Sequence, residues 1–254
     1  MRWVGGLLLL ALLAVLALQL WFLGWVAYWK WENPTETAFM KREIARLQNE
    51  AQKNEAQKSA QKNNKNKTAN NATKPASSPT APLRFQWVPY ARISNHLKRA
   101  VITAEDARFV EHEGVDWDAL QKAYENNLKR GKPARGGSTI SQQVAKNLFL
   151  SGERSYLRKG QELIITWMIE WVWGKQRILE VYLNVAEWGE GLFGAEAAAR
   201  YYFGVSAAQL SAAQSARLAT FLPSPKRYGR MRTGPYLDGR AAAIEQAMPG
   251  ALLP

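Results

Sequence analysis

The sequence predicts an all-α globular domain that is tethered to a membrane by an N-terminal helix. Three observations in the chain of 254 residues predict this class. Residues 4–29 contain no charged side chain, residues 48–82 contain no large apolar side chain, and a helical pattern of apolar residues runs onward from residue 83. No later segment alternates convincingly between apolar and polar residues, as a half-buried strand would.

The apolar stretch at residues 4–29 is long enough to cross a bilayer. At about 1.5 Å per residue, a helix of this length exceeds a hydrocarbon core of roughly 30 Å. A cleaved signal peptide is the alternative, but the run is long and no A-x-A-like site ends it. We expect a retained transmembrane anchor, with residues 1–3 as a short cytoplasmic N-terminus, although the flanking charges alone do not set its orientation. Aromatic residues crowd the end of this stretch, as is typical of the headgroup level: Trp21, Phe22, Trp25, Tyr28, Trp29 and Trp31.

Residues 30–82 read as a juxtamembrane helix followed by a flexible low-complexity linker. The segment TETAFMKREIARL at 35–47 has the spacing of a short amphipathic helix. The sequence NEAQK then occurs twice in tandem, at 49–53 and 54–58, before Lys/Asn-rich and Pro/Ser-rich sequence. Such a composition cannot bury enough apolar surface to offset its ordering entropy, so we expect a tether whose first turns alone are helical.

Residues 83–254 form the predicted globular domain. The helix that begins after Ser94 is expected to continue to His112, and the helix Leu157–Trp173, which is apolar on several sides, is expected to be central and buried. The tryptophans of that helix are therefore expected mainly in the core. The predicted helices span residues 94–112, 117–128, 141–150, 157–173, 175–183, 195–202 and 206–221.

The chain carries 34 Lys and Arg against 21 Asp and Glu, a net charge of +13, which favours anionic partners. Beside a membrane anchor, anionic lipid or a phosphorylated substrate is a more natural partner than nucleic acid. A nucleic-acid binder would need its cations clustered on one folded face, whereas six lysines against two glutamates lie in the linker at 48–82. The absence of cysteine suits an exported domain but does not establish one.

Acidic residues concentrate in one stretch, 102–118, and Glu105 stands out among them. A continuous helix would place Glu105 on the same face as Phe109 and His112. A carboxylate on a buried face is costly unless it is paired or functional, and burial raises its pKa toward values that suit a general base. The alternative is a structural carboxylate satisfied by a cap or a lysine. A metal site is the weaker interpretation here, because one histidine with scattered carboxylates has no recognisable ligand spacing.

A second polar segment runs from Arg135 to Asn147. It reads as a Gly-Gly turn, two hydroxyls, and a helix that opens with two glutamines, which would suit phosphate or sugar hydroxyls. The same residues also make an ordinary loop with a helix cap. Four cations then precede Glu162, and on spacing alone the pair Lys159–Glu162 is as well explained by a solvated ion pair. The four cations are Lys146, Arg154, Arg158 and Lys159.

Two glutamates on separate helices suggest glycosidic chemistry, which commonly uses paired carboxylates. The neighbouring cations favour synthesis over hydrolysis, because a sugar pyrophosphate needs positive charge to hold its leaving group. A lysozyme-like lytic enzyme and a purely structural membrane scaffold remain the alternatives.

Five ordered motifs carry a closer resemblance. They are AEDARFVEHEG, GGSTISQQVAKN, RKGQE, ILEVYLN and GAEAAARYYFG, and they follow one another between residues 85 and 228. The chain therefore resembles the peptidoglycan glycosyltransferases of family 51. The W-V-P at 87–89 and an end at residue 254, which leaves no room for a transpeptidase domain, make it similar to the monofunctional enzymes of that family. It departs from the common pattern at Ser141, where Thr is frequent, and at Gln214, where an acid is frequent.

The resemblance implies a lysozyme-like fold and the polymerisation of lipid II into β-1,4-linked glycan strands with inversion. It implies Glu105 as the general base and Glu162 as a second catalytic acid, which orients the pyrophosphate directly or through a divalent cation, Mg²⁺ or Mn²⁺. Asp106 and His112 would support the motif helix. No organic cofactor is expected. The implied partners are lipid II, the growing lipid-linked chain, the membrane and wall-synthesis or cell-division proteins, with the catalytic domain on the periplasmic side of a bacterial inner membrane. The implied substrate-binding residues are Ser138, Gln142, Gln143, Lys146, Asn147, Arg154, Arg158 and Lys159.

Overall fold

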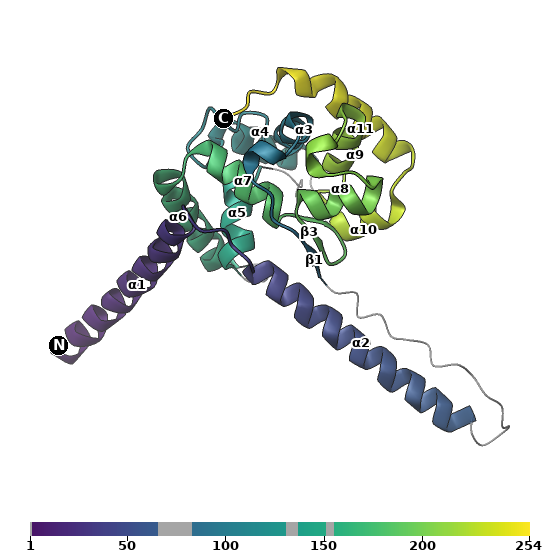
Figure 1. The fold of residues 1–254 in the computed structure, drawn as a ribbon. Coiled ribbons are helices and arrows are strands. Elements are labelled where there is room, and N and C mark those ends of the chain that lie inside the picture. Colours follow the sequence, from purple (N-terminus) through teal and green to yellow (C-terminus); the bar gives the residue numbers. More distant parts are fainter. Residues whose placement is uncertain (1, 66–82, 131–136, 151–154) are drawn as a thin grey trace.

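The computed structural model describes residues 2–65, 83–130, 137–150 and 155–254. In this part of the chain the predicted all-α class is confirmed, because helices dominate and the strands are very short. Figure 1 shows a helical body from which two helices, α1 and α2, project in different directions. The α-helices are α1 Arg2–Tyr28, α2 Ala38–Lys65, α3 Asn95–Glu105, α4 Trp117–Arg130, α5 Ile140–Phe149, α6 Tyr156–Val172, α7 Lys175–Val185, α8 Ala195–Phe203, α9 Ala212–Ala219, α10 Pro225–Met231 and α11 Pro235–Ala247.

Three short strands form one sheet, and the sequence did not predict them. The order is β1 (Arg84–Phe85), β3 (Leu192–Phe193) and β2 (Glu187–Gly189), with β1 parallel to β3 and β2 antiparallel to it. Strands of two or three residues are too short to show an alternating pattern, which explains the omission.

Helices α5 and α7 form the centre of the body. Ile140, Val144 and Leu148 of α5 are buried, as are Ile178 and Tyr182 of α7. Helix α6 packs on α5 and α7, and α3 packs on α9, which α11 covers from outside. The residues proposed from the sequence as polar and functional lie mostly on α5, α6 and the end of α3, so the core helices position them directly.

The predicted helix 94–112 is wrong in its second half. Helix α3 ends at Glu105, and Asp106 leaves the helical region with φ −163° and ψ 74°. Residues 107–111 form turns and residues 112–114 a bend, so Glu105, Phe109 and His112 do not share a helix face. The side chain of Asp106 accounts for the break, because it bonds to groups outside the helix, and such bonds compete with helix continuation.

Three other predicted elements also differ from the structure. The segment 206–221 is a 3₁₀ turn, Ala207–Gln209, followed by a separate helix that Ser211 caps. Helix α6 is not fully buried, since Trp167 and Trp171 are exposed and only Trp173 enters the core. Helix α2 runs well beyond residue 47, through both NEAQK repeats, and the helices α10 and α11 were not predicted.

Helix α1 is long and apolar enough to cross a membrane between Trp3 and Tyr28. Its last turns pack on the body, where Val26 is fully buried and its carbonyl accepts a hydrogen bond of 2.8 Å from the indole Nε1 of Trp173. Gln19 exchanges two amide hydrogen bonds of 2.9 Å with Gln161 of α6. The one strongly polar side chain of the anchor is therefore satisfied by the body of the protein.

Candidate active site

Glu105 is the last residue of α3, and a hydrogen-bonded chain orients its carboxylate. The amide Nε2 of Gln143 donates to Oε2 of Glu105 at 2.9 Å. The hydroxyl of Tyr182, which is almost fully buried in α7, donates to Oε1 of Gln143 at 3.2 Å. Because Tyr182 fixes the amide of Gln143, the donor side of that amide must face Glu105.

Burial raises the pKa of Glu105 above its ordinary value. The hydrogen bond from Gln143 and the positive charges of Arg240 and Lys146 offset part of this rise, while the neighbouring charge of Asp106 adds to it. A carboxylate with a raised pKa is a stronger base than an ordinary one, so this environment suits proton abstraction near neutral pH. Arg240 lies on α11, after the five motifs, and the sequence patterns did not indicate it.

Asp106 joins the end of α3 to the start of α5. Its Oδ2 accepts a hydrogen bond of 2.9 Å from the backbone N–H of Ile140, and its Oδ1 lies 2.9 Å from Nε2 of His112. Both side chains are buried: 3% of the Asp106 side chain and 7% of the His112 side chain are exposed. The expectation that Asp106 and His112 are supporting residues fits this geometry, although they support a helix end and a turn instead of one long helix.

The first turn of α5 is fixed by a capping box between Thr139 and Gln142. The hydroxyl of Thr139 accepts from the backbone N–H of Gln142 at 3.2 Å, and the side chain of Gln142 accepts from the backbone N–H of Thr139 at 3.2 Å. The Thr139 hydroxyl also donates to the carbonyl of Gly114 at 2.6 Å. Gly114 has φ +87°, and a Cβ there would lie 2.8 Å from Thr166, so only glycine fits this contact.

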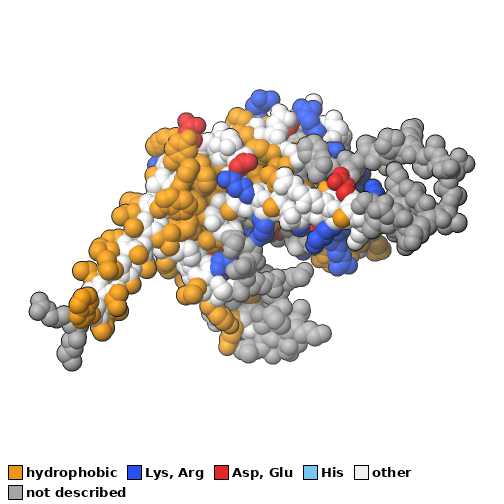
Figure 2. Space-filling model, turned by 90° about the horizontal axis from the view of Figure 1, so that it is seen from below, with side chains coloured by type: hydrophobic (Ala, Val, Ile, Leu, Met, Phe, Trp, Pro, Cys, Tyr) orange, Lys and Arg blue, Asp and Glu red, His pale blue; other side chains and the backbone are white. Residues whose placement is uncertain are grey.

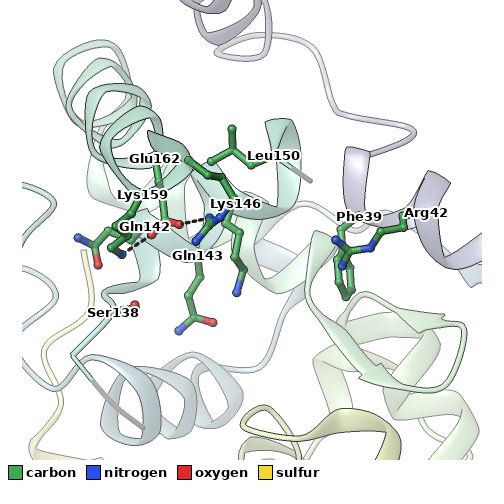
Figure 3. Close-up of a pocket in the computed structure, with 10 residues that line it drawn as sticks. Phe39, Arg42, Ser138, Gln142, Gln143, Lys146, Leu150, Lys159 and Glu162 are labelled. Carbon is green, nitrogen blue, oxygen red and sulfur yellow. Dashed lines mark hydrogen bonds and ion pairs between the residues drawn. The ribbon is translucent and has the colours of Figure 1, made fainter. Parts of the chain in front are cut away.

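Glu162 of α6 is a buried carboxylate held by two cations. Its side chain is 4% exposed, Nη1 of Arg158 donates to Oε2 at 2.7 Å, and Nζ of Lys159 donates to Oε1 (Figure 3). The sequence left a solvated ion pair open as an explanation. The carboxylate end of the pair is not solvated, because only 4% of the Glu162 side chain is exposed, and a buried carboxylate depends on such partners for its stability.

These groups line a pocket of about 310 Å³. Lys146 of α5 reaches into it beside the Glu162 cluster, and no carboxylate among the described residues pairs with its ammonium. Burial in the cleft lowers the pKa of Lys146, although the charge of Glu162 opposes the shift. The pocket walls are formed by Phe39, Arg42, Ser138, Gln142, Gln143, Lys146, Leu150, Arg158, Lys159 and Glu162.

A second pocket, of about 260 Å³, contains Glu105 and adjoins the first. Ser138 lines both pockets, and Gln143 lines the first while donating to Glu105. The site therefore has two compartments, one with a single raised-pKa carboxylate and one rich in cations. Gln143 and Ser138 lie where the two compartments meet.

Most of the residues proposed from the sequence come together in this way. Asn147 is buried in α5 but lines neither pocket, and Arg154 lies outside the described residues. The sequence patterns missed Phe39 and Arg42, which belong to the segment interpreted as a juxtamembrane helix. In the sequence they appear only as part of an amphipathic helical pattern, and such a pattern does not distinguish a helix that lines a cleft from a helix that lies on a membrane surface.

The described residues contain no group of three or more His, Asp or Glu side chains placed to hold a metal ion. Both oxygens of Glu162, the predicted ligand, are taken by Arg158 and Lys159. A divalent cation bound by protein groups alone does not fit this donor set. The divalent cation remains a prediction that chelation can test.

The chain thus combines an apolar helix long enough to cross a membrane with a cleft that holds one carboxylate of raised pKa and a cluster of cations, features that fit a transferase with an anionic substrate. Comparison with known proteins makes this class specific. The model of the transglycosylase family matches residues 72–249, which is well over half of the chain. The chain belongs to the transglycosylase family, and it is an enzyme of the glycosyltransferase class.

Similar proteins share almost the full length of the chain. A biosynthetic peptidoglycan transglycosylase of Janthinobacterium sp. (strain Marseille) is 52% identical over 248 residues, covering 98% of this chain and 96% of the relative. One from Dechloromonas aromatica is 51% identical over 253 residues, covering 100% and 98%. One from Bordetella pertussis is 47% identical over 251 residues, covering 97% and 93%. The family that the five motifs indicated is thus confirmed.

Proposed function

We propose that the protein polymerises lipid II into the β-1,4-linked glycan strands of peptidoglycan and so serves cell wall biosynthesis. The observation that carries the proposal is the pairing of two compartments: the Glu105 carboxylate with its raised pKa, and the adjoining pocket where Lys146, Arg158 and Lys159 gather. One compartment can accept a proton and the other can hold a diphosphate. The similarity to biosynthetic peptidoglycan transglycosylases supports the same substrate.

In this mechanism Glu105 takes the proton of the acceptor 4-hydroxyl. The acceptor oxygen attacks C1 of the donor sugar from the face opposite the pyrophosphate, the C1–O bond to the pyrophosphate breaks, and the configuration at C1 inverts. The electron pair of that bond leaves with undecaprenyl pyrophosphate. Lys146 and the Arg158–Glu162–Lys159 cluster stabilise the negative charge that develops on it, and they are already in place before the reaction begins. Glu162 acts by fixing the two cations.

We propose that the anchor α1 lies in the inner membrane of a bacterium, with the catalytic body on the periplasmic side. Apolar side chains cover α1 and continue onto the body where α1 meets it, as Figure 2 shows. Trp167 and Trp171 are exposed on α6, the helix on which α1 packs. Exposed indole rings favour the interface between headgroups and hydrocarbon, so this surface would bring the cleft to the lipid-linked substrate.

Incubation of the protein with lipid II, and separately with finished glycan strands, tests the proposed function. We expect growth of glycan chains from lipid II and no cleavage of finished strands. Cleavage without growth would identify a lytic enzyme. The absence of both growth and cleavage would favour a structural scaffold. Repeating the reaction with a chelator tests the cation, because unchanged activity would exclude a required divalent metal.

A further inference from the structure

Helix α2 contributes one wall of the cation-rich pocket. In Figure 3, Phe39 and Arg42 extend from α2 on one side, while Lys146 and Glu162 come from α5 and α6 on the other. All four side chains line the same pocket of about 310 Å³. The segment that follows the membrane anchor is therefore part of the candidate active site.

The charges around this pocket are not all balanced within the protein. Arg158 and Lys159 both pair with Glu162. Across the residues for which coordinates are described, neither Arg42 nor Lys146 forms an ion pair with a carboxylate. Two cations on different walls of one pocket, both without an acidic partner, leave positive charge available for an anionic ligand.

The guanidinium of Arg42 is held by an aromatic ring instead of a carboxylate. Its Cζ lies 4.8 Å from the centroid of the Phe39 ring, and that ring meets Phe193 of β3 edge to face at 5.8 Å. Stacking on an aromatic face leaves the N–H groups at the edge of the guanidinium free to donate. The neighbouring Lys41 differs, since it pairs with Glu36 and its side chain is 67% exposed.

The beginning of α2 is fixed against the body by buried contacts. Met40 is 1% exposed, and the carboxylate of Glu43, which is 5% exposed, pairs with Lys226 of α10 and with Arg46. Arg46 also pairs with Glu190 in the turn between β2 and β3 at 2.7 Å. These contacts span both sides of Arg42 along the helix, so its position in the pocket is set by the fold.

We propose that Arg42 binds the diphosphate of the lipid-linked substrate, and that the diphosphate is held between Arg42 of α2 and Lys146 of α5. The inference rests on the proposed function and adds to it a binding residue supplied by the helix that follows the anchor. Arginine suits this position because its planar guanidinium can donate two parallel hydrogen bonds to phosphate oxygens. Because α2 follows the anchor α1, binding at Arg42 also places the diphosphate near the membrane, where a polyprenyl carrier would keep its tail in lipid.

The test uses the full-length protein in detergent or lipid vesicles, with variants Arg42→Ala and Arg42→Lys. Lys41→Ala is the matched control, because it removes a like charge one residue away on the same helix. Two quantities are measured: kcat and KM for lipid II polymerisation, and the inhibition or binding constant of inorganic pyrophosphate. Melting temperatures check the fold, and we expect Arg42→Ala to melt within a few degrees of the wild type, since Arg42 loses its stacking on Phe39 but has no acidic partner to lose among the described residues.

We expect Arg42→Ala to raise both KM and the pyrophosphate constant roughly tenfold, as the loss of a charge-assisted hydrogen bond implies. Arg42→Lys should recover part of the loss, and Lys41→Ala should stay within about twofold of the wild type. Constants for Arg42→Ala within twofold of the wild type, or an equal effect of Lys41→Ala, would overturn the proposal. A wild type that binds pyrophosphate through Arg42 but does not polymerise lipid II would instead refute the proposed function alone.

Discussion

Removing the carboxylate of Asp106 should both destabilise the protein and reduce its activity. Asp106 is buried and links the end of α3, where Glu105 lies, to the backbone N–H of Ile140 and to His112. Substitution by Ala removes two hydrogen bonds to a charged acceptor and leaves the buried N–H of Ile140 without its partner. Each such bond contributes about 1.5–3 kcal/mol, so the variant should lose roughly 3–6 kcal/mol of stability.

Thermal unfolding in detergent, followed by tryptophan fluorescence, measures this loss. For a chain of this size each kcal/mol lowers Tm by about 2–4 °C, so Asp106→Ala should melt on the order of 10 °C below the wild type. Asp106→Asn is the matched control, since its amide oxygen can still accept from Ile140, and it should lose roughly 1 kcal/mol. A Tm for Asp106→Ala within about 2 °C of the wild type would refute the claim that this carboxylate joins the two segments.

Three further changes test individual contacts. Gln143→Leu removes the donor that lowers the pKa of Glu105, so the acidic limb of kcat/KM against pH should move to higher pH; an unmoved limb would argue against Glu105 as the base. Burial raises the pKa of Glu187 from 4.5 to about 7, so the folded chain keeps a proton that the unfolded chain releases, and stability should fall as pH rises through that window. In Glu187→Gln this part of the fall in Tm should disappear, and equal slopes in both proteins would contradict the assignment. Trp173→Phe leaves the carbonyl of Val26 unpaired and should lower Tm by a few degrees, whereas Trp171→Phe, at a side chain 81% exposed, should not; equal effects would show that the docking of α1 does not depend on this bond.

The sequence predicted the helices of the central body because their apolar spacing and caps are local. The helices α4 to α8 begin and end within two residues of their predicted spans. The break after Glu105 could not be seen, because its cause is a bond from Asp106 to Ile140, thirty-four positions later in the chain. Likewise, β1 exists only because it pairs with β3 more than a hundred residues away.

The same distinction applies to the candidate site. The motifs identified Glu105, Gln143, Lys146 and Glu162, which the structure brings into two adjoining pockets. They did not identify the contributions of α2 and α11, because Arg42 and Arg240 lie outside the motifs. Tertiary packing alone brings Arg42 into the cation-rich pocket and lets the charge of Arg240 act on Glu105. The burial of Glu162 also depends on packing, since the spacing Lys159–Glu162 is the same for a surface ion pair.

Glu105 is proposed as the base for glycan polymerisation. The most direct measurement is the initial rate of chain growth from lipid II by Glu105→Gln and by the wild type, with Tm recorded for both. A general base contributes about 10²–10⁴ in rate, and the variant keeps the shape of the side chain, so we expect at least a hundredfold loss at a Tm close to that of the wild type. A folded Glu105→Gln protein that polymerises lipid II within about tenfold of the wild-type rate would show that Glu105 is not the base.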